Sequence, residues 1–213
     1  ALAQTAGTAV MRFADADLLP YDFADFANTA GDYLHQVEDL LKTMQQQTRE
    51  QNKEIGEGVF TATADPTKKF VPPTIQPVPP HLNFAPLENA LDALNQSAHQ
   101  YQKVFNQAEQ NGGEALAHAQ LQQVNSLLVQ SERKLTYAGG LPGRPWYKHE
   151  VYAPGLYTGY GVKTLPAVRE SIEQKQWKEA DDQIQIVAKV LDGEAALIGS
   201  AASQLEKATR HGI

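Results

Sequence analysis

One segment of the sequence, residues 138–163, is dense in side chains that recognise ligands. Its glycines and prolines constrain the backbone path, and Arg144 and Lys148 add positive charges that could contact an anion. Four tyrosines offer hydroxyl groups on stiff side chains: Tyr147, Tyr152, Tyr157 and Tyr160. The segment is therefore the candidate binding loop of this chain. For any one of these tyrosines, a structural role as a packed aromatic residue is the alternative.

The rest of the sequence contains no recognisable catalytic motif. The six histidines never occur four residues apart, and there is no HExxH, GxSxG or P-loop pattern. The Gly159-Tyr160-Gly161 triplet follows no predicted strand, unlike a nucleotide-binding GxGxxG motif. Acidic pairs on or beside predicted helices are interpreted as solvated helix surface: Asp15/Asp17, Glu38/Asp39 and Asp181/Asp182. We therefore assign this chain no catalytic residue, no metal ligand and no cofactor.

Composition narrows the classes of partner. The 213 residues include 18 Lys and Arg against 25 Asp and Glu, a net charge of −7, and the basic residues are scattered singly. This distribution excludes the basic surface that nucleic acids and anionic membranes require. The absence of cysteine excludes disulfides, thiolate metal sites and cysteine nucleophiles. Apolar stretches fall far short of the roughly 20 residues that span a bilayer, so we expect no membrane segment.

Hydrophobic spacing predicts the helices that must position the loop. Apolar residues recur at steps of three and four, the pattern of one buried helix face, over four long segments: 23–44, 87–108, 117–135 and 184–205. Shorter helices are predicted at 5–17 and at 165–174, where Thr164 can cap the first turn. Alternation typical of strands is almost absent. The sequence therefore predicts an all-α four-helix bundle, with the second and third helices as an antiparallel hairpin around Asn111-Gly112-Gly113.

Residues 56–80 do not fit a helical description. They show no helical period and contain six prolines: Pro66, Pro72, Pro73, Pro77, Pro79 and Pro80. Because proline fixes φ and lacks a donor, we predict an extended crossover between the first two long helices, ordered as a strap across the bundle. The alternative is a ligand for a proline-recognising domain, but no PxxP pair has a well-placed flanking arginine.

A family resemblance is found in the candidate loop. Residues 141–149, Leu-Pro-Gly-Arg-Pro-Trp-Tyr-Lys-His, followed by Tyr152-Ala153-Pro154, resemble the C-terminal motif of the glutamate carboxypeptidase II and transferrin receptor family. Residues 9–22 resemble the helix that leads from that family's protease domain into its last domain, and residues 165–188 resemble its final helical stretch. The resemblance spans nearly the whole chain, with 56–80 as the poorest match.

The resemblance implies a domain organisation. Residues 1–20 would be a linking helix from the protease domain, and residues 21–213 the four-helix dimerisation domain, with 138–163 as its substrate-side loop. The family's two zinc ions are bound by the protease domain, which would lie outside this chain. The implied partners are a second copy in a homodimer, the protease domain and, in the parent protein, a peptide substrate. Family members function outside the cytoplasm, which favours a periplasmic or secreted location.

The resemblance also suggests a substrate contact. In members that prefer a C-terminal glutamate, a Lys-Tyr pair after the Tyr-Ala-Pro motif binds the glutamate carboxylate. Tyr160 matches the tyrosine, whereas Gly159 stands at the position of the lysine. Loss of the cation leaves a neutral hydrogen bond in place of a charge-assisted one, which argues against a strict preference for glutamate.

Three functions are compatible with these patterns. The first is the C-terminal dimerisation domain of a zinc-dependent carboxypeptidase or aminopeptidase, inactive when separated from its catalytic domain. The second is the assembly domain of a receptor-like or scaffold homologue whose protease domain has lost its zinc ligands. The third is a free-standing helical adaptor, which predicts a stable monomer. The residues that would precede Ala1 distinguish the first two.

Overall fold

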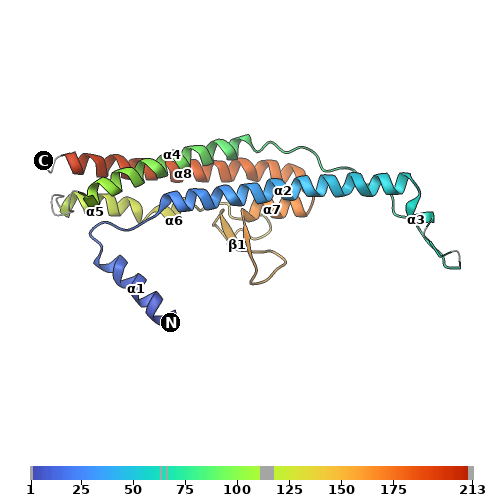
Figure 1. Cartoon of the computed structure of the whole chain (residues 1–213), viewed down its shortest axis with the longest axis horizontal. Coiled ribbons are helices and arrows are strands. Elements are labelled where there is room, and N and C mark those ends of the chain that lie inside the picture. The colour runs from blue at the N-terminus through green and yellow to red at the C-terminus, as the bar shows by residue number, and fades with distance from the viewer. Residues whose placement is uncertain (1, 63, 66, 111–117, 211–213) are drawn as a thin grey trace.

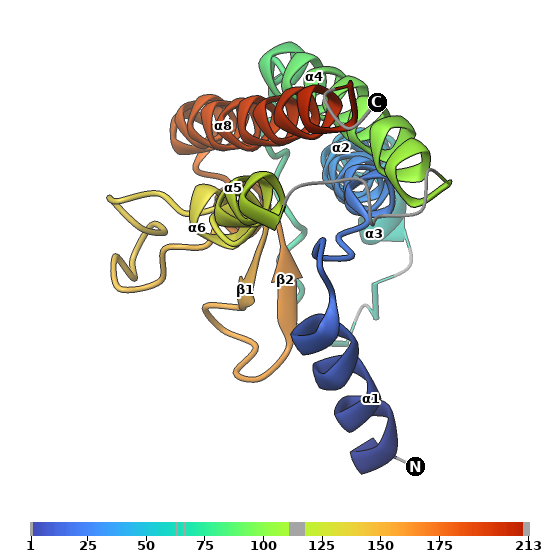
Figure 2. The ribbon, with the colours of Figure 1, turned by 90° about the vertical axis from the view of Figure 1, so that its left-hand side faces the viewer.

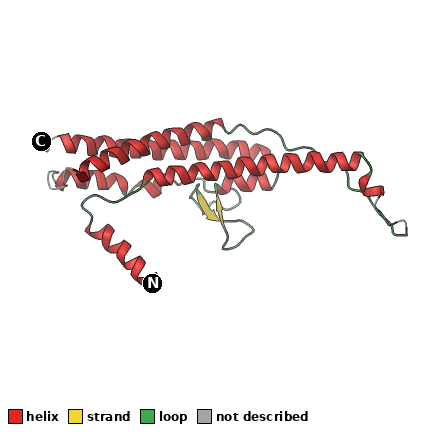
Figure 3. Cartoon of the chain, in the orientation of Figure 1, coloured by secondary structure: helices red, strands yellow, loops and turns green. Residues whose placement is uncertain are grey.

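The protein is almost entirely helical (Figure 3). The computed structural model describes residues 2–62, 64–65, 67–110 and 118–210. The four longer helices of the body are α2 (Phe23–Gly56), α4 (Ala85–Gln110), α5 (His118–Leu128) and α8 (Trp177–Arg210). They lie alongside one another, with α2 and α5 running in one direction and α4 and α8 in the other (Figure 1). The predicted all-α class is confirmed.

Six further elements complete the structure in the described residues. They are α1 (Leu2–Asp15), α3 (Val59–Ala62), α6 (Ser131–Lys134), α7 (Pro166–Glu173), β1 (Tyr152–Pro154) and β2 (Val162–Thr164). The two strands form an antiparallel hairpin between α6 and α7. No strand was predicted, because three residues are too few for the alternation of apolar and polar side chains to be recognised. Within the described residues, no helix combines the length and apolar character needed to cross a bilayer.

Helix α8 is the centre of the packing. It contacts α4 along much of its length and also packs on α5, α6 and α7 (Figure 2). Its buried side chains recur on one face: Ile184, Val187, Leu191, Ile198 and Leu205. They share a core with buried side chains of α2, α4 and α5, among them Leu34, Leu94 and Leu128. A single apolar core therefore connects the long helices.

The second and third predicted helices run in opposite directions, as expected, but they do not pack mainly on each other as a hairpin would. Helix α5 packs mainly on α8 and not on α4, because spacing identifies a buried face but not the face that it meets. The third helix is also shorter than predicted, since α5 ends at Leu128 and α6 begins at Ser131. The predicted connection at Asn111-Gly112-Gly113 lies outside the described residues.

Helix α2 continues three turns beyond its predicted end at Met44. It begins at a capped turn, where the Asp22 carboxylate accepts a hydrogen bond from Asp25 N at 2.9 Å. Its polar C-terminal part is covered by the extended residues 69–84, which we call the strap (Figure 1). Gln45 Nε2 donates to Pro79 O at 3.2 Å, and the Asn52 amide exchanges two hydrogen bonds with the Gln76 backbone at 2.7 and 2.9 Å. Because the prolines of the strap have no N–H group to donate, side chains of α2 supply hydrogen-bond partners for the strap backbone.

Helix α1 points away from the other helices (Figures 1 and 2). None of its residues is buried, and its apolar side chains Val10 and Met11 are exposed. The segment that follows it is attached to α5, because Asn125 accepts from Leu19 N at 3.0 Å and donates to Asp17 O at 2.8 Å. Hydrogen bonds therefore attach the segment after α1 to the body, although α1 itself buries no residue.

Candidate functional site

The candidate loop begins at the end of α6 with a short backbone ladder. Tyr137 N donates to Lys148 O at 2.8 Å, and Glu150 N donates to Leu135 O at 2.9 Å. A tight turn lies between these contacts, with Gly140 at φ 70°. A Cβ atom at Gly140 would lie 2.2 Å from the carbonyl oxygen of Pro145, so the turn accepts only glycine there.

The β1–β2 hairpin follows this turn. Tyr152 pairs with Thr164 and Pro154 with Val162, which leaves residues 155–161 as the connecting turn. Leu165 N donates to Val151 O at 2.8 Å and joins the end of the hairpin to its start. The hairpin therefore presents the exposed residues 157–161 at its tip, which points away from the long helices (Figure 1).

Helix α7 follows the hairpin and packs between it and the main core. Its side chains Val168 and Ile172 are fully buried in the main core, which mounts the helix firmly. The predicted cap by Thr164 is wrong, because the helix is preceded by Leu165 at φ 44° and has no side-chain cap. The Thr164 hydroxyl instead accepts a hydrogen bond from Arg169 Nη2 at 2.9 Å. Thr164 thus joins β2 to α7.

Arg144 occupies a buried position between the hairpin and α7. Its Nη2 atom lies 2.7 Å from Glu170 Oε2, with exposed side-chain fractions of 3% and 8% for the two residues. Its Nη1 atom donates to the carbonyl oxygen of Pro154, and Leu156 N donates to Glu170 Oε1 at 2.7 Å. The guanidinium also lies over the Tyr147 ring, 5.6 Å from its centroid. One ion pair therefore contacts the turn, the hairpin and the helix.

The expectation that Arg144 contacts an external anion is corrected by its position, whereas the same expectation for the exposed Lys148 stays a prediction. The Arg144 guanidinium is buried and already paired with the Glu170 carboxylate. Lys148 Nζ donates to the carbonyl oxygen of Ala138 within the same loop. Sequence analysis missed Glu170, because no spacing rule links two residues 26 positions apart that lie in different elements.

The tip of the hairpin leaves its aromatic side chains exposed. Tyr157 is 81% exposed and Tyr160 is 103% exposed, so neither ring packs on the described part of the chain. Gly159 has φ 59°, with open space around the position of a Cβ atom. The turn is closed from within, since Thr158 Oγ1 donates to Gly161 O at 2.9 Å and Gly155 N donates to the same oxygen at 2.9 Å.

A second cluster lies at the base of the loop. The rings of His149 and Tyr152 are 4.2 Å apart, and His149 Nδ1 accepts from Tyr152 N at 3.2 Å. Burial lowers the pKa of His149, and the nearby Glu132 carboxylate, 3.3 Å from Nε2, opposes this effect. Burial and the same carboxylate raise the pKa of Tyr152. Both pKa shifts therefore favour the neutral form of the side chain.

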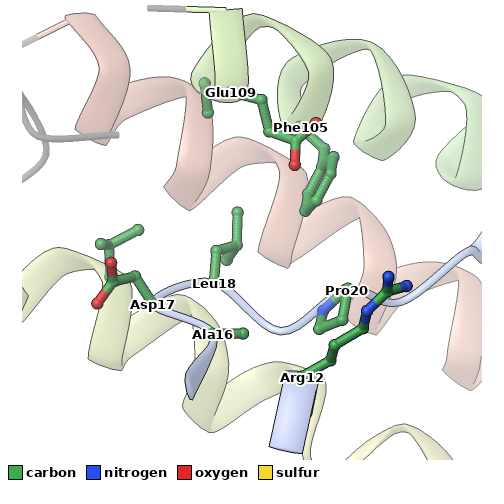
Figure 4. Close-up of a pocket in the computed structure, with 9 residues that line it drawn as sticks. Arg12, Ala16, Asp17, Leu18, Pro20, Phe105 and Glu109 are labelled. Atoms are coloured by element: carbon green, nitrogen blue, oxygen red, sulfur yellow. The ribbon is translucent and has the colours of Figure 1, made fainter. Parts of the chain in front are cut away.

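A separate pocket of about 350 Å³ lies between residues 12–20, at the end of α1, and the helices α4 and α5 (Figure 4). Arg12, Ala16, Leu18 and Pro20 line one side, and Phe105 of α4 lies across from them. The pocket contains none of the residues selected from the sequence. Among the described residues, no group of three His, Asp or Glu side chains is placed to hold a metal ion.

Comparison with known proteins places the chain in a family. A profile of the transferrin receptor-like dimerisation domain matches residues 82–199, more than half of the sequence. The chain therefore belongs to the transferrin receptor-like dimerisation domain family. The matched range begins just before α4 and includes the whole candidate loop and most of α8. The resemblance to this family is confirmed over residues 82–199, which contain the candidate loop.

Individual relatives have peptidase names. A probable glutamate carboxypeptidase of Arthroderma benhamiae is 31% identical over 121 residues, which cover 57% of this chain and 16% of that protein. A probable glutamate carboxypeptidase of Arabidopsis thaliana is 35% identical over 78 residues, 33% of this chain and 12% of that protein. An inactive zinc metalloprotease of Schizosaccharomyces pombe is 29% identical over 75 residues, 35% of this chain and 9% of that protein. The matches span less than a fifth of each relative.

Proposed function

We propose that this chain is the dimerisation domain of a zinc-dependent exopeptidase resembling glutamate carboxypeptidase, and that residues 155–161 contribute a substrate contact to the pocket of its protease domain. The observation that supports the substrate contact is the fully exposed Tyr160 hydroxyl at the tip of a hydrogen-bonded turn. A stiff aromatic side chain that no neighbour covers suits contact with a molecule outside the domain. In this proposal the domain has no hydrolytic activity of its own.

Tyr160 would bind the substrate as a neutral hydrogen-bond donor. A phenolic O–H can donate to a terminal carboxylate, but Gly159 provides no positive charge beside it. Arg144 cannot replace that charge, because it is buried against Glu170. Substrate selection at this position would therefore be weaker than in relatives with a lysine.

The protease domain would contact two further surfaces. Trp146, Tyr152 and Tyr157 are exposed on the candidate loop, and aromatic residues of this kind are enriched in protein interfaces. Helix α1 exposes Val10 and Met11 and buries nothing within this chain. A preceding domain that packs on α1 would cover these apolar side chains and account for residues 1–20 as a linking helix.

A receptor-like or scaffold role is the second candidate. One relative is named an inactive zinc metalloprotease, so the family accommodates proteins without activity. Such a protein would keep the helical domain for assembly and would have no use for Tyr160. Measurement of zinc content in the whole protein separates the two roles, because the scaffold role predicts none.

Removal of the Tyr160 hydroxyl tests the substrate contact. In the whole protein, we expect Tyr160→Phe to raise KM with little change in kcat. The cost is about 0.5–1.5 kcal/mol for a neutral hydrogen bond and roughly 1.5–3 kcal/mol if the acceptor is a carboxylate. Steady-state kinetics on dipeptides with acidic, amide and apolar C-terminal residues would measure it. Unchanged constants on every cleaved peptide would contradict the proposal.

A pair of variants at position 159 tests whether a positive charge there changes the substrate preference. Gly159→Lys restores the charge, and Gly159→Gln introduces a neutral side chain of similar length at the same positive φ. Both variants share the backbone strain. A shift toward acidic C-terminal residues in the lysine variant alone would therefore report the charge.

Self-association of the chain is a separate prediction. Exposed apolar side chains on the strap, such as Val71 and Ile75, offer surface that a second copy could cover. We expect sedimentation equilibrium of the 213-residue chain to show a dimer that strengthens with concentration. Part of the dimer contact would involve the protease domain, which weakens association of the chain alone. A constant monomer mass up to the highest concentration would argue for the adaptor role.

A further inference from the structure

We infer that the buried Arg144–Glu170 ion pair sets the position of the 155–161 turn, so that both residues are positioning residues for the substrate contact of Tyr160. The inference rests on the proposed function, since it concerns the same contact. Neither side chain is placed to touch a substrate, because both are almost completely covered by their own domain.

The two residues hold the turn at the point where it leaves β1. Arg144 Nη1 donates to Pro154 O, and Glu170 Oε1 accepts from Leu156 N at 2.7 Å. These two backbone groups flank Gly155, the first residue of the turn. The ion pair between Nη2 and Oε2, at 2.7 Å, closes the arrangement. The backbone is therefore fixed on both sides of the position from which the turn departs.

Directional bonding distinguishes this pair from ordinary packing. Desolvation of two buried charges offsets most of their attraction, so an ion pair of this kind contributes little net stability compared with apolar side chains. Apolar side chains could fill the same volume, but they could not donate to Pro154 O and accept from Leu156 N. The planar guanidinium donates along two fixed directions at once, which a lysine cannot do. The particular contribution of the ion pair is therefore to fix the positions of these two backbone groups.

The support beneath the pair is rigid, and the turn above it is a closed unit. Helix α7 is anchored by Val168 and Ile172 in the main core. The turn is closed by the hydrogen bonds of Gly155 N and Thr158 Oγ1 to Gly161 O. A change at the base would therefore displace the turn, and Tyr160 with it, since the Tyr157 and Tyr160 side chains at the exposed tip are not packed on the described part of the chain.

A second ion pair on the same helix provides a matched control. Lys163 Nζ of β2 lies 2.6 Å from Glu173 Oε1, but these side chains are 20% and 34% exposed, and among the described residues no hydrogen bond joins the Glu173 carboxylate to the backbone of the turn. Glu170→Gln and Glu173→Gln therefore make the same chemical change on α7, one turn apart. They differ in whether the changed carboxylate accepts a hydrogen bond from the backbone of the turn.

The test is a double-mutant cycle in the whole protein. We expect Glu170→Gln to raise KM on the preferred dipeptide by no more than Tyr160→Phe does, which is roughly two- to 150-fold, with kcat changed less than twofold. Glu173→Gln should leave both constants within about twofold. In a Tyr160→Phe background, Glu170→Gln should have little further effect on KM, because the contact it positions is already absent. Arg144→Lys should resemble Glu170→Gln.

Each outcome of the cycle has a defined meaning. An equal effect of Glu170→Gln with and without the Tyr160 hydroxyl would overturn the positioning role while leaving the substrate contact intact. An unchanged KM in Tyr160→Phe would overturn both. Amide exchange measured by mass spectrometry gives a readout that needs no activity: exchange over residues 155–161 should increase in Glu170→Gln and not in Glu173→Gln. Unchanged exchange in both variants would also overturn the inference.

Discussion

Replacement of Leu191 by alanine is expected to lower the free energy of unfolding by about 2–5 kcal/mol. Leu191 is completely buried on α8, the helix that packs on α4, α5, α6 and α7. Truncation would remove its contacts and leave a cavity at the centre of the core, where neighbours anchored in several helices cannot easily close it. Urea denaturation followed by circular dichroism would measure the change.

Lys189→Ala is the control for this truncation. It shortens an exposed side chain two residues away on the same helix, so we expect a change within about 0.5 kcal/mol. If both variants unfolded at the same urea concentration, α8 would not be the centre of the core. A change confined to Leu191→Ala would show that the packing around α8 supports the whole domain.

The second large effect concerns the pH dependence of stability. Glu150 is fully buried, and neither carboxylate oxygen has a hydrogen-bond partner in the described part of the chain. Burial raises the pKa of Glu150 from 4.5 to about 7. The folded state therefore retains a proton between these values that the unfolded state has released. The contribution of Glu150 to the free energy of unfolding is fully present below about pH 4.5. It falls by roughly 3 kcal/mol as the pH rises to 7.

Glu150→Gln should remove this loss, because the amide stays neutral at every pH. We expect the variant to gain roughly 3 kcal/mol relative to the natural protein between pH 4 and pH 8, measured by urea denaturation across the series. Glu54→Gln, at an exposed position of α2, is the control and should follow the natural protein. Parallel curves for Glu150→Gln and the natural protein would contradict the raised pKa.

Glu194 makes a related contribution from α8. It is also fully buried, and burial raises its pKa to about 7 although the Ser131 hydroxyl donates to Oε1 at 2.5 Å. That hydrogen bond favours the ionised form and opposes the effect of burial. Both carboxyl groups therefore act in the same direction and make the domain more stable in mildly acidic solution than above neutral pH.

Much of the helical core could be predicted from the sequence because burial imposes a period. Leu34, Leu94 and Ile198 each lie in one of the segments predicted to have a buried helix face, and all three are buried. The end of α2 was missed because residues 45–54 are almost entirely polar, and their partner is a strap that lies 24 or more residues away. The break at Val129 was missed because no glycine or proline marks it. Local pattern thus predicts faces but not tertiary partners.

The candidate loop could be found by composition and resemblance, but its arrangement could not. Tyr160 was selected because it matches a family position, and its exposure is compatible with that choice. Arg144 was assigned to an external anion because a positive charge in a loop normally faces water. Its partner Glu170 belongs to another element, and only the folded chain brings the two together.

The strap has a consequence for aggregation. It is an extended, exposed segment with four large apolar side chains on the surface: Phe70, Val71, Ile75 and Val78. An open segment of this composition would ordinarily recruit strands from other molecules. Prolines at positions 72, 73, 77, 79 and 80 have no N–H to offer, and the amide of Gln76 is already bonded to Asn52. The strap can thus expose apolar side chains without acting as a template for intermolecular β-sheet.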